Sequence, residues 1–152
     1  MRVNTDGKRN EKDLTDEQLD EAINFAVKLG MPIDRIVYSP YECTAYGTLL
    51  DILIIGTDVL PLGIRTNEPN SNISLKGTIS HEIVGHREAA LKKKTQSNSL
   101  SEEAQASIRA ARFTPDLNYQ ERMDLIKDAI VRLKKANIKI KDIKSQLYID
   151  ER

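Results

Sequence analysis

The chain has 152 residues, of which 23 are basic and 23 acidic, so its formal net charge is zero. Nucleic-acid-binding domains normally carry an excess of Lys and Arg, and this balance therefore argues against a nucleic-acid partner. Cys43 is the single cysteine, which excludes an intrachain disulfide framework and a cysteine-based zinc finger. The length suits one domain with a real hydrophobic core.

The N-terminal residues 1–13 are polar and charged, and they lack the apolar segment of a signal peptide. No run in the chain approaches transmembrane length, so we expect no membrane partner. Residues 1–13 are predicted to be a flexible tail or linker, and residues 14–152 a single soluble domain. Location in the cytoplasm and delivery or secretion as part of a longer chain both fit this composition.

The first predicted helix begins at a capping residue, Thr15 or Asp16, and ends before Gly30 and Pro32. Its apolar side chains recur at helical spacing and predict one buried face, made of Leu19, Ala22, Ile23 and Ala26. Nothing on this helix is chemically distinctive, so we assign it to the scaffold.

Three short runs after this helix have the composition of β-strands. Residues 35–38 are apolar and β-branched, and residues 49–55 form an apolar run between two glycines. Residues 73–76 are a third candidate, which leads directly into the next helix. Residues 58–72, with their Pro, Gly and Asn side chains, are predicted to form a long loop that is either functional or a tolerated surface excursion.

Both histidines of the chain, His81 and His86, lie in residues 80–88, with Glu82 beside the first and Gly85 before the second. A zincin helix spaces its metal-binding histidines four residues apart, so that both project from one face. A five-residue step on an ideal α-helix leaves the two rings about 140° apart. A π-type widening of the turn restores the overlap, and Gly85 stands where such a backbone would need it. We interpret the stretch as a metal site on a helix over residues 77–94.

An acidic helix follows over residues 100–113, and Ser99 and Glu102 have the spacing of a capping box at its start. Its small side chains would let it approach the preceding helix closely: Ala104, Ala106, Ser107, Ala110 and Ala111. The same residues also make a good helix of any kind, and spacing does not separate the two readings.

The C-terminal third is predicted to be scaffold. Asn118 and Glu121 form a capping pattern before an amphipathic helix whose apolar face holds Met123, Ile126, Ile130 and Leu133. Residues 138–149 are predicted to be one short helix, or a strand followed by a helix.

The HExxGH form of the motif resembles that of the dipeptidyl-peptidase III family of zinc peptidases, where it reads HELLGH. In that family the last zinc ligand comes from a second helix with an EECRA-type sequence, and this chain has Glu-Glu-Ala-Gln-Ala over residues 102–106. The resemblance implies a complete site, with the zinc ligands His81, His86 and Glu103, the catalytic base Glu82, and a partner Glu102 that orients a ligand histidine.

Residues 58–152 also resemble the zincin-type C-terminal modules of bacterial polymorphic toxins. Asn72-Ile73-Ser74 before the motif and His86-Arg87-Glu88-Ala89 within it carry this resemblance. It implies a zincin-like fold in which an edge strand, here residues 73–76, lies along the cleft and can pair with a substrate chain. The partners implied are a peptide or protein substrate and a neutralising immunity protein.

We therefore expect an α+β fold, with a small sheet packed against four to five helices and a metal held between two adjacent helices. Two imidazoles and one carboxylate favour Zn²⁺ as the cofactor, although iron and manganese also accept such ligands. The expected activity is zinc-dependent peptide hydrolysis. Tyr46, Arg109 and Tyr119 are the candidates for a further donor that stabilises the transition state.

The alternative is a non-catalytic domain, in which the metal braces two helices or the cleft serves as a binding module. Glu82 favours the enzyme, because a purely structural metal site has no need of a base beside its ligand. A closed fourth coordination position would favour the alternative.

Overall fold

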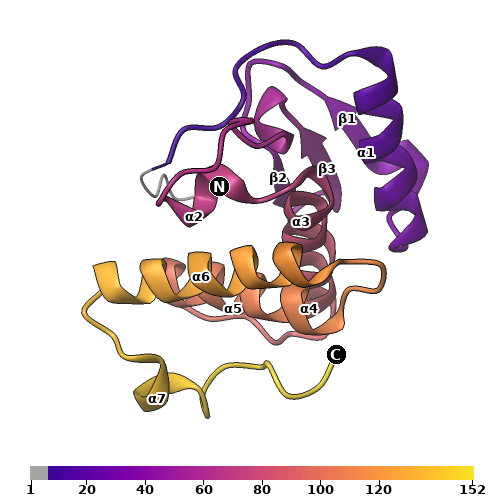
Figure 1. Ribbon diagram of the computed structural model, residues 1–152. Helices are drawn as coiled ribbons and strands as arrows, with labels where there is room; N and C mark the ends of the chain where they lie inside the picture. The colour runs from indigo at the N-terminus through magenta and orange to yellow at the C-terminus, as the bar shows by residue number, and fades with distance from the viewer. Residues whose placement is uncertain (1–6) are drawn as a thin grey trace.

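The computed structural model describes residues 7–152 and has an α+β fold, as the sequence predicts (Figure 1). A three-stranded sheet lies across a long helix, and two further long helices pack on the other side of that helix. The elements in chain order are α1 (Asp16–Lys28), η1 (Ile33–Arg35), β1 (Ile36–Tyr38), β2 (Ala45–Gly47), β3 (Ile52–Ile55), η2 (Thr57–Val59), α2 (Pro69–Asn72), α3 (Leu75–Ser80), η3 (His81–Arg87), α4 (Glu88–Leu91), α5 (Ser99–Phe113), α6 (Tyr119–Lys135) and α7 (Ile140–Ile143).

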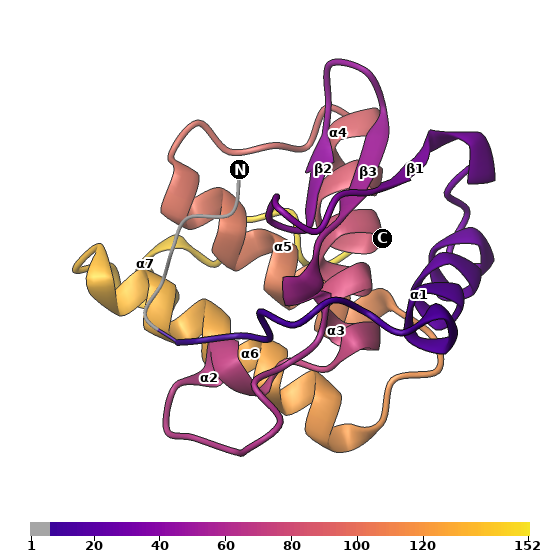
Figure 2. The same ribbon diagram turned by 90° about the horizontal axis from the view of Figure 1, so that it is seen from above.

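The sheet has the strand order β1-β3-β2, with β1 parallel and β2 antiparallel to β3 (Figure 2). The strand predicted over residues 49–55 begins only at Ile52, because Asp51 adopts a positive φ of 51° that turns the chain. Leu49 and Leu50 are exposed in that turn. The sequence did not predict β2, a strand of three residues that ends in Gly47. It forms one edge of the sheet, and β1 forms the other.

The strand predicted over residues 73–76 is wrong, since this segment leads into and begins α3. Ser74 is the N-cap of α3 and accepts a hydrogen bond from the Gly77 backbone N–H at 3.0 Å. A serine N-cap satisfies a free helix donor and so favours a helix start over a continued strand. The predicted loop over residues 58–72 contains part of η2 and all of α2.

The predicted tail, residues 1–13, lies partly outside the described residues. Within the described part, Arg9 is buried, and its guanidinium donates to the backbone carbonyls of Asp58, Val59 and Ile73. These hydrogen bonds attach the segment around Arg9 to η2 and to the residues before α3. The expectation of a flexible tail does not hold here, because a buried arginine, rather than an apolar side chain, anchors the segment.

The helix starts follow their capping residues. Thr15 forms a capping box with Gln18 at the start of α1, and Asn118 forms the predicted one with Glu121 at the start of α6. Asn98, rather than the predicted Ser99, caps α5. Residues 138–149 contain α7 and no strand, so the helix alternative holds there.

The apolar side chains form two clusters. The principal core lies between α1, the sheet, α3 and η3, and includes Phe25, Leu53, Ile55, Ile79, Ile83 and Leu125. The smaller C-terminal core lies between α5, α6 and the last residues, and consists of Ala104, Ile108, Ala129, Leu133, Leu147 and Ile149.

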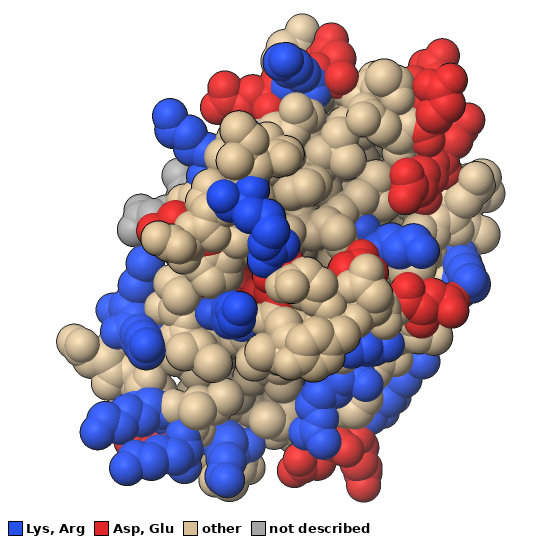
Figure 3. All heavy atoms as spheres, viewed as in Figure 1, with Lys and Arg blue, Asp and Glu red and all other residues tan. Residues whose placement is uncertain are grey.

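Charge is distributed unevenly over the neutral molecule. Acidic side chains gather over α1, and basic side chains gather over α7 and the C-terminal end of α6 (Figure 3). Within residues 7–152, no helix combines the length and apolar character that a membrane span requires.

Candidate metal centre

The motif helix changes its winding at the histidines. The α-helical turns of α3 give way at His81 to the π-helical segment η3, which continues into α4 after Arg87. At its end the Glu88 backbone N–H bonds to the Ile83 carbonyl, five residues earlier. The wider turn places side chains five residues apart on one face. The predicted widening between His81 and His86 is therefore confirmed.

The wider turn brings the two imidazole rings into contact. Their centroids are 4.7 Å apart with an interplanar angle of 80°, and His86 Nε2 lies 3.1 Å from His81 Nε2. His81 is buried, whereas His86 is partly exposed. The two Nε2 atoms thus form one side of a possible ion site.

Gly85 serves the packing between helices. Its φ is not in the positive range that favours glycine, so the π-helical backbone itself does not require it. A Cβ at this position would come within 2.5 Å of the Ala106 carbonyl oxygen on α5. The absence of a side chain at Gly85 lets α5 approach η3, and this replaces our expectation that Gly85 accommodates a distorted backbone.

The close approach of α5 brings Glu103 to the histidines. Glu103 Oε2 lies 2.9 Å from His81 Nε2 and 3.3 Å from His86 Nε2. One donor atom from each of these three residues lies within 4.8 Å of the others, so the group could hold a metal ion. The structure brings together the three residues that the motifs imply as ligands.

The donor chemistry of this group fits a metal. Each histidine has its Nδ1 engaged on the far side of the ring, at 2.9 Å from Ser107 Oγ for His81 and 3.1 Å from Glu102 Oε2 for His86. Both Nε2 atoms therefore face Glu103. Two imidazole nitrogens and one carboxylate oxygen that converge in this way match the ligand set of catalytic zinc sites.

Glu102 lies beside the ligand group and contacts only one of its histidines. One carboxylate oxygen bonds to His86 Nδ1, and the other accepts a hydrogen bond from the Gln96 backbone N–H at 2.9 Å. Glu102 therefore joins His86 to the loop between α4 and α5, in the orienting position that the resemblance implies.

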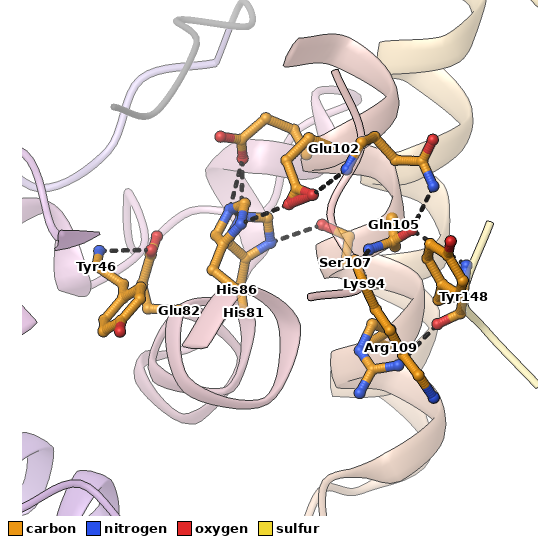
Figure 4. Close-up of polar contacts among 12 residues, drawn as sticks. Tyr46, His81, Glu82, His86, Lys94, Glu102, Gln105, Ser107, Arg109 and Tyr148 are labelled. Carbon is orange, nitrogen blue, oxygen red and sulfur yellow. Dashed lines mark hydrogen bonds and ion pairs between the residues drawn. The ribbon is translucent and has the colours of Figure 1, made fainter. Parts of the chain in front are cut away.

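Glu82 lies on the opposite side of the histidines from Ser107 (Figure 4). It is almost completely buried, and its Oε2 accepts a hydrogen bond from the Tyr46 backbone N–H of β2 at 2.9 Å. Edge strand β2 therefore holds the Glu82 carboxylate in place.

A cavity of about 410 Å³, the size expected of a small-ligand pocket, opens over these residues. Its lining comes from β2, from the loop between α4 and α5, and from the site itself, and includes Ala45, Tyr46, Thr48, Glu82, His86, Gln96, Glu102 and Glu103. The prospective base and two of the prospective ligands share this one cavity.

Only one of the three expected transition-state donors lies at this cavity. Tyr46 lines it, and its hydroxyl donates to Asp51 at 2.8 Å. Burial and the hydrogen bond to Asp51 raise the pKa of Tyr46 to about 12. Arg109 is buried and donates instead to the carbonyls of Tyr148 and Glu151, and Tyr119 is exposed at the start of α6. The structure thus removes Arg109 and Tyr119 from the candidates.

Opposite charges meet at this site. Burial disfavours the charged imidazolium of His86, but hydrogen bonds to Glu102 and Glu103 outweigh it and raise the pKa of His86 to about 10. Burial likewise opposes ionisation of Glu103, yet hydrogen bonds from His81 and His86 hold the pKa of Glu103 well below its usual range. These hydrogen bonds favour the imidazolium form of His86 and the carboxylate form of Glu103, so a metal ion that bound here would displace a proton.

Sequence reasoning missed the residues that support His81. In the sequence Ser107 is one of several small side chains on the acidic helix, and no pattern connects it with Asp128 or Arg132 of α6. An Asp and an Arg four residues apart on a helix look like an exposed ion pair.

Comparisons of the chain with protein-family models, with curated proteins and with solved structures found no match.

Proposed function

We propose that the protein is a zinc-dependent peptidase whose ligands are His81, His86 and Glu103. The observation that carries this proposal is the position of Glu82, whose buried carboxylate faces the same cavity as His86 and Glu103. A site that only braced two helices would have no use for a carboxylate at this place. Zincin-like identity is part of the proposal and is supported by the two motifs and by the π-helical turn.

Zinc held by these residues would supply Lewis acidity that activates water and polarises the scissile carbonyl. Glu82 accepts a proton from the attacking water and passes it to the leaving amine, the role of a general base and then a general acid. The Tyr46 backbone N–H holds the carboxylate in place from the strand side. Glu102 keeps the ring of His86 oriented from the loop side.

The substrate is proposed to be an extended peptide segment of a protein. Strand β2 is one of the two edge strands of the sheet, and Ala45 and Tyr46 line the cavity beside Glu82. An edge strand can pair its backbone groups with an added peptide strand, and because the Tyr46 N–H is bonded to Glu82, the pairing would use the other backbone groups of β2. This assigns to β2 the substrate-binding part that the sequence placed on residues 73–76.

The biological setting is proposed from the motif residues alone. Asn72-Ile73-Ser74 and His86-Arg87-Glu88-Ala89 resemble the zincin-type toxin modules of bacteria. In that setting the enzyme would act on a protein of a target cell, and an immunity protein would neutralise it by covering the cleft.

The test is the variant Glu82→Gln, assayed against a broad peptide library and in a cell-toxicity assay. Loss of a general base should reduce hydrolysis by about 10² to 10⁴-fold, while the zinc content stays at the wild-type level. Glu88→Gln on the same helix is the control and should retain activity, because Glu88 pairs with Arg152 away from the cavity.

Equal activity of wild type and Glu82→Gln would contradict the peptidase mechanism. If both proteins bind zinc, neither hydrolyses any library peptide, and zinc raises their unfolding free energy, the metal braces η3 against α5. That result would establish the non-catalytic alternative.

A further inference from the structure

A chain of buried polar side chains extends from His81 to α6, on the side away from the cavity. His81 Nδ1 lies 2.9 Å from Ser107 Oγ, and Ser107 Oγ lies 2.9 Å from Asp128 Oδ2. Arg132 Nε donates to the same Asp128 oxygen at 2.8 Å. Ser107 and Arg132 are fully buried, and Asp128 is 1% exposed. Three helices, η3, α5 and α6, therefore contribute to one hydrogen-bonded chain.

The direction of each hydrogen bond follows from the chemistry of the groups. The carboxylate of Asp128 pairs with the Arg132 guanidinium and acts only as an acceptor. The Ser107 hydroxyl must then donate to Asp128, which leaves its oxygen lone pairs to accept from His81. His81 therefore carries a proton on Nδ1, so Nε2, beside His86 and Glu103, is the ring nitrogen that would bind a metal ion.

The two histidines are supported in parallel ways. His86 Nδ1 donates directly to the Glu102 carboxylate, and His81 Nδ1 reaches the Asp128 carboxylate through the Ser107 hydroxyl. Carboxylates that accept from the far nitrogen of a ligand histidine fix its tautomer and orientation and raise its basicity. The buried serine lets a carboxylate on α6 do this for a histidine that it does not touch.

Arg132 connects the chain to the third ligand. Its Nη1 lies 3.8 Å from Glu103 Oε2, while its Nε pairs with Asp128. One buried guanidinium thus lies beside both carboxylates and reduces their repulsion. Buried charges are costly unless they are paired, so this arrangement points to a role in the site rather than in packing alone.

We propose that Ser107 and Asp128 are positioning residues that set the tautomer and orientation of His81, and thereby the zinc affinity of the site. The proposal rests on the proposed metal site at His81, His86 and Glu103. It assigns to α6 a direct influence on the metal, although α6 supplies no ligand.

The first measurement is the zinc affinity of wild type, Ser107→Ala and Asp128→Asn, by competition with a chromophoric chelator. Loss of a partner of this kind should weaken zinc binding by about 10 to 100-fold. The controls are matched by helix and burial. Ser101→Ala removes another buried hydroxyl of α5, and Asp124→Asn alters a buried α6 carboxylate that pairs with Arg65 instead. Both controls should keep the wild-type affinity.

The second measurement is the imidazole proton on His81 Nδ1 in the zinc-loaded protein, observed by nitrogen-15 NMR. The chain has only two histidines, so the two ring signals can be assigned with single His variants. In wild type this proton should exchange slowly with solvent, because it is buried and bonded to Ser107. In Ser107→Ala it should exchange measurably faster, an effect that a general loss of packing at Ser101→Ala would not reproduce.

The outcomes separate this inference from the proposed function. If wild type binds no zinc, the metal site itself fails. If wild type binds zinc and both variants bind it as tightly, with unchanged exchange of the His81 proton, the positioning role is overturned while the site stands. Because Asp128→Asn removes the charge that pairs with Arg132 Nε, unfolding curves are recorded for each variant, and Ser107→Ala alone decides if Asp128→Asn does not fold.

Discussion

The principal core and the layer between η3, α5 and α6 are stabilised in different ways. The principal core holds apolar side chains such as Phe25, Leu53 and Ile79, for which burial alone supplies the free energy. The layer between the helices, here called the polar layer, is equally buried but consists of His81, Glu103, Ser107, Asp128 and Arg132. Burial of such groups is costly unless each has a partner.

The difference between the two regions indicates where function resides. A core made only for stability would gain from apolar replacements of buried ion pairs, which are often neutral or stabilising. In the polar layer, hydrogen bonds instead connect the buried polar groups into a chain, and this chain leads to the two histidine Nε2 atoms and Glu103. We therefore expect variants in the principal core to change stability alone, and variants at the polar layer to change zinc binding.

The largest expected effect is on stability, from Phe25→Ala in the principal core. Phe25 is 6% exposed on α1, and truncation of a buried Phe to Ala typically costs about 3 to 5 kcal/mol. Urea unfolding of the metal-free protein measures this loss of unfolding free energy. The control is Val27→Ala, at an exposed position of the same helix, which should change the unfolding free energy by no more than about 0.5 kcal/mol. The zinc affinity of folded Phe25→Ala should equal that of wild type, and a parallel loss of affinity would contradict the separation of the two regions.

A smaller effect is expected from Gly85→Ala, which acts on both properties. The new Cβ would lie 2.5 Å from the Ala106 carbonyl oxygen, so α5 must move away from η3. Overpacking of this kind costs about 1 to 3 kcal/mol, and the shift of α5 should also weaken zinc binding because α5 carries Glu103. Gly47→Ala is the control, since its Cβ would meet only the Ile52 carbonyl at 3.8 Å. An unchanged zinc affinity in Gly85→Ala would show that the close approach does not position Glu103.

The smallest effect is expected from Asp51→Asn, in the turn before β3. The hydrogen bond from Arg87 lowers the pKa of Asp51 in the folded protein below its unfolded value. The pairing of Asp51 with Arg87 therefore stabilises the fold at pH values above the pKa of Asp51 in the unfolded chain. This stabilisation is lost as the pH falls through the pKa of Asp51 in the folded protein. Asp51 is 35% exposed on its side chain, so the effect should remain below about 1 kcal/mol.

Unfolding free energies at neutral and acid pH test this prediction. The difference between wild type and Asp51→Asn should shrink as the pH is lowered from 7 to 3, because the aspartate of the wild type becomes protonated. Asn also tolerates the positive φ at this position, so the substitution removes the charge without straining the backbone. A difference that stays constant with pH would contradict the ion-pair account.

The sequence predicted the parts of the molecule that follow periodicity and local chemistry. The five-residue spacing of His81 and His86 predicted the π-helical turn, and the capping pattern of Asn118 and Glu121 predicted the start of α6. The pairing of Glu103 with the histidines followed only from the motif resemblance, because the distance between two helices does not follow from residue spacing.

The parts that were missed depend on tertiary partners. The α6 residues Asp128 and Arg132 have the i, i+4 spacing of an exposed ion pair, yet both are buried against Ser107 and Glu103. Strand β2 is too short to show an alternating pattern, and Arg9 is buried by a ring of backbone carbonyls that no local pattern predicts.

The most direct test of the central claim is the metal content of the protein, measured by elemental analysis after purification without added metal. Wild type should contain about one zinc per chain, as expected for one site with two imidazoles and one carboxylate. His81→Ala and His86→Ala should contain almost none, while Glu82→Gln should match wild type. Absence of any transition metal from wild type, together with failure to bind zinc tightly on titration, would contradict the metal centre and the peptidase function built on it.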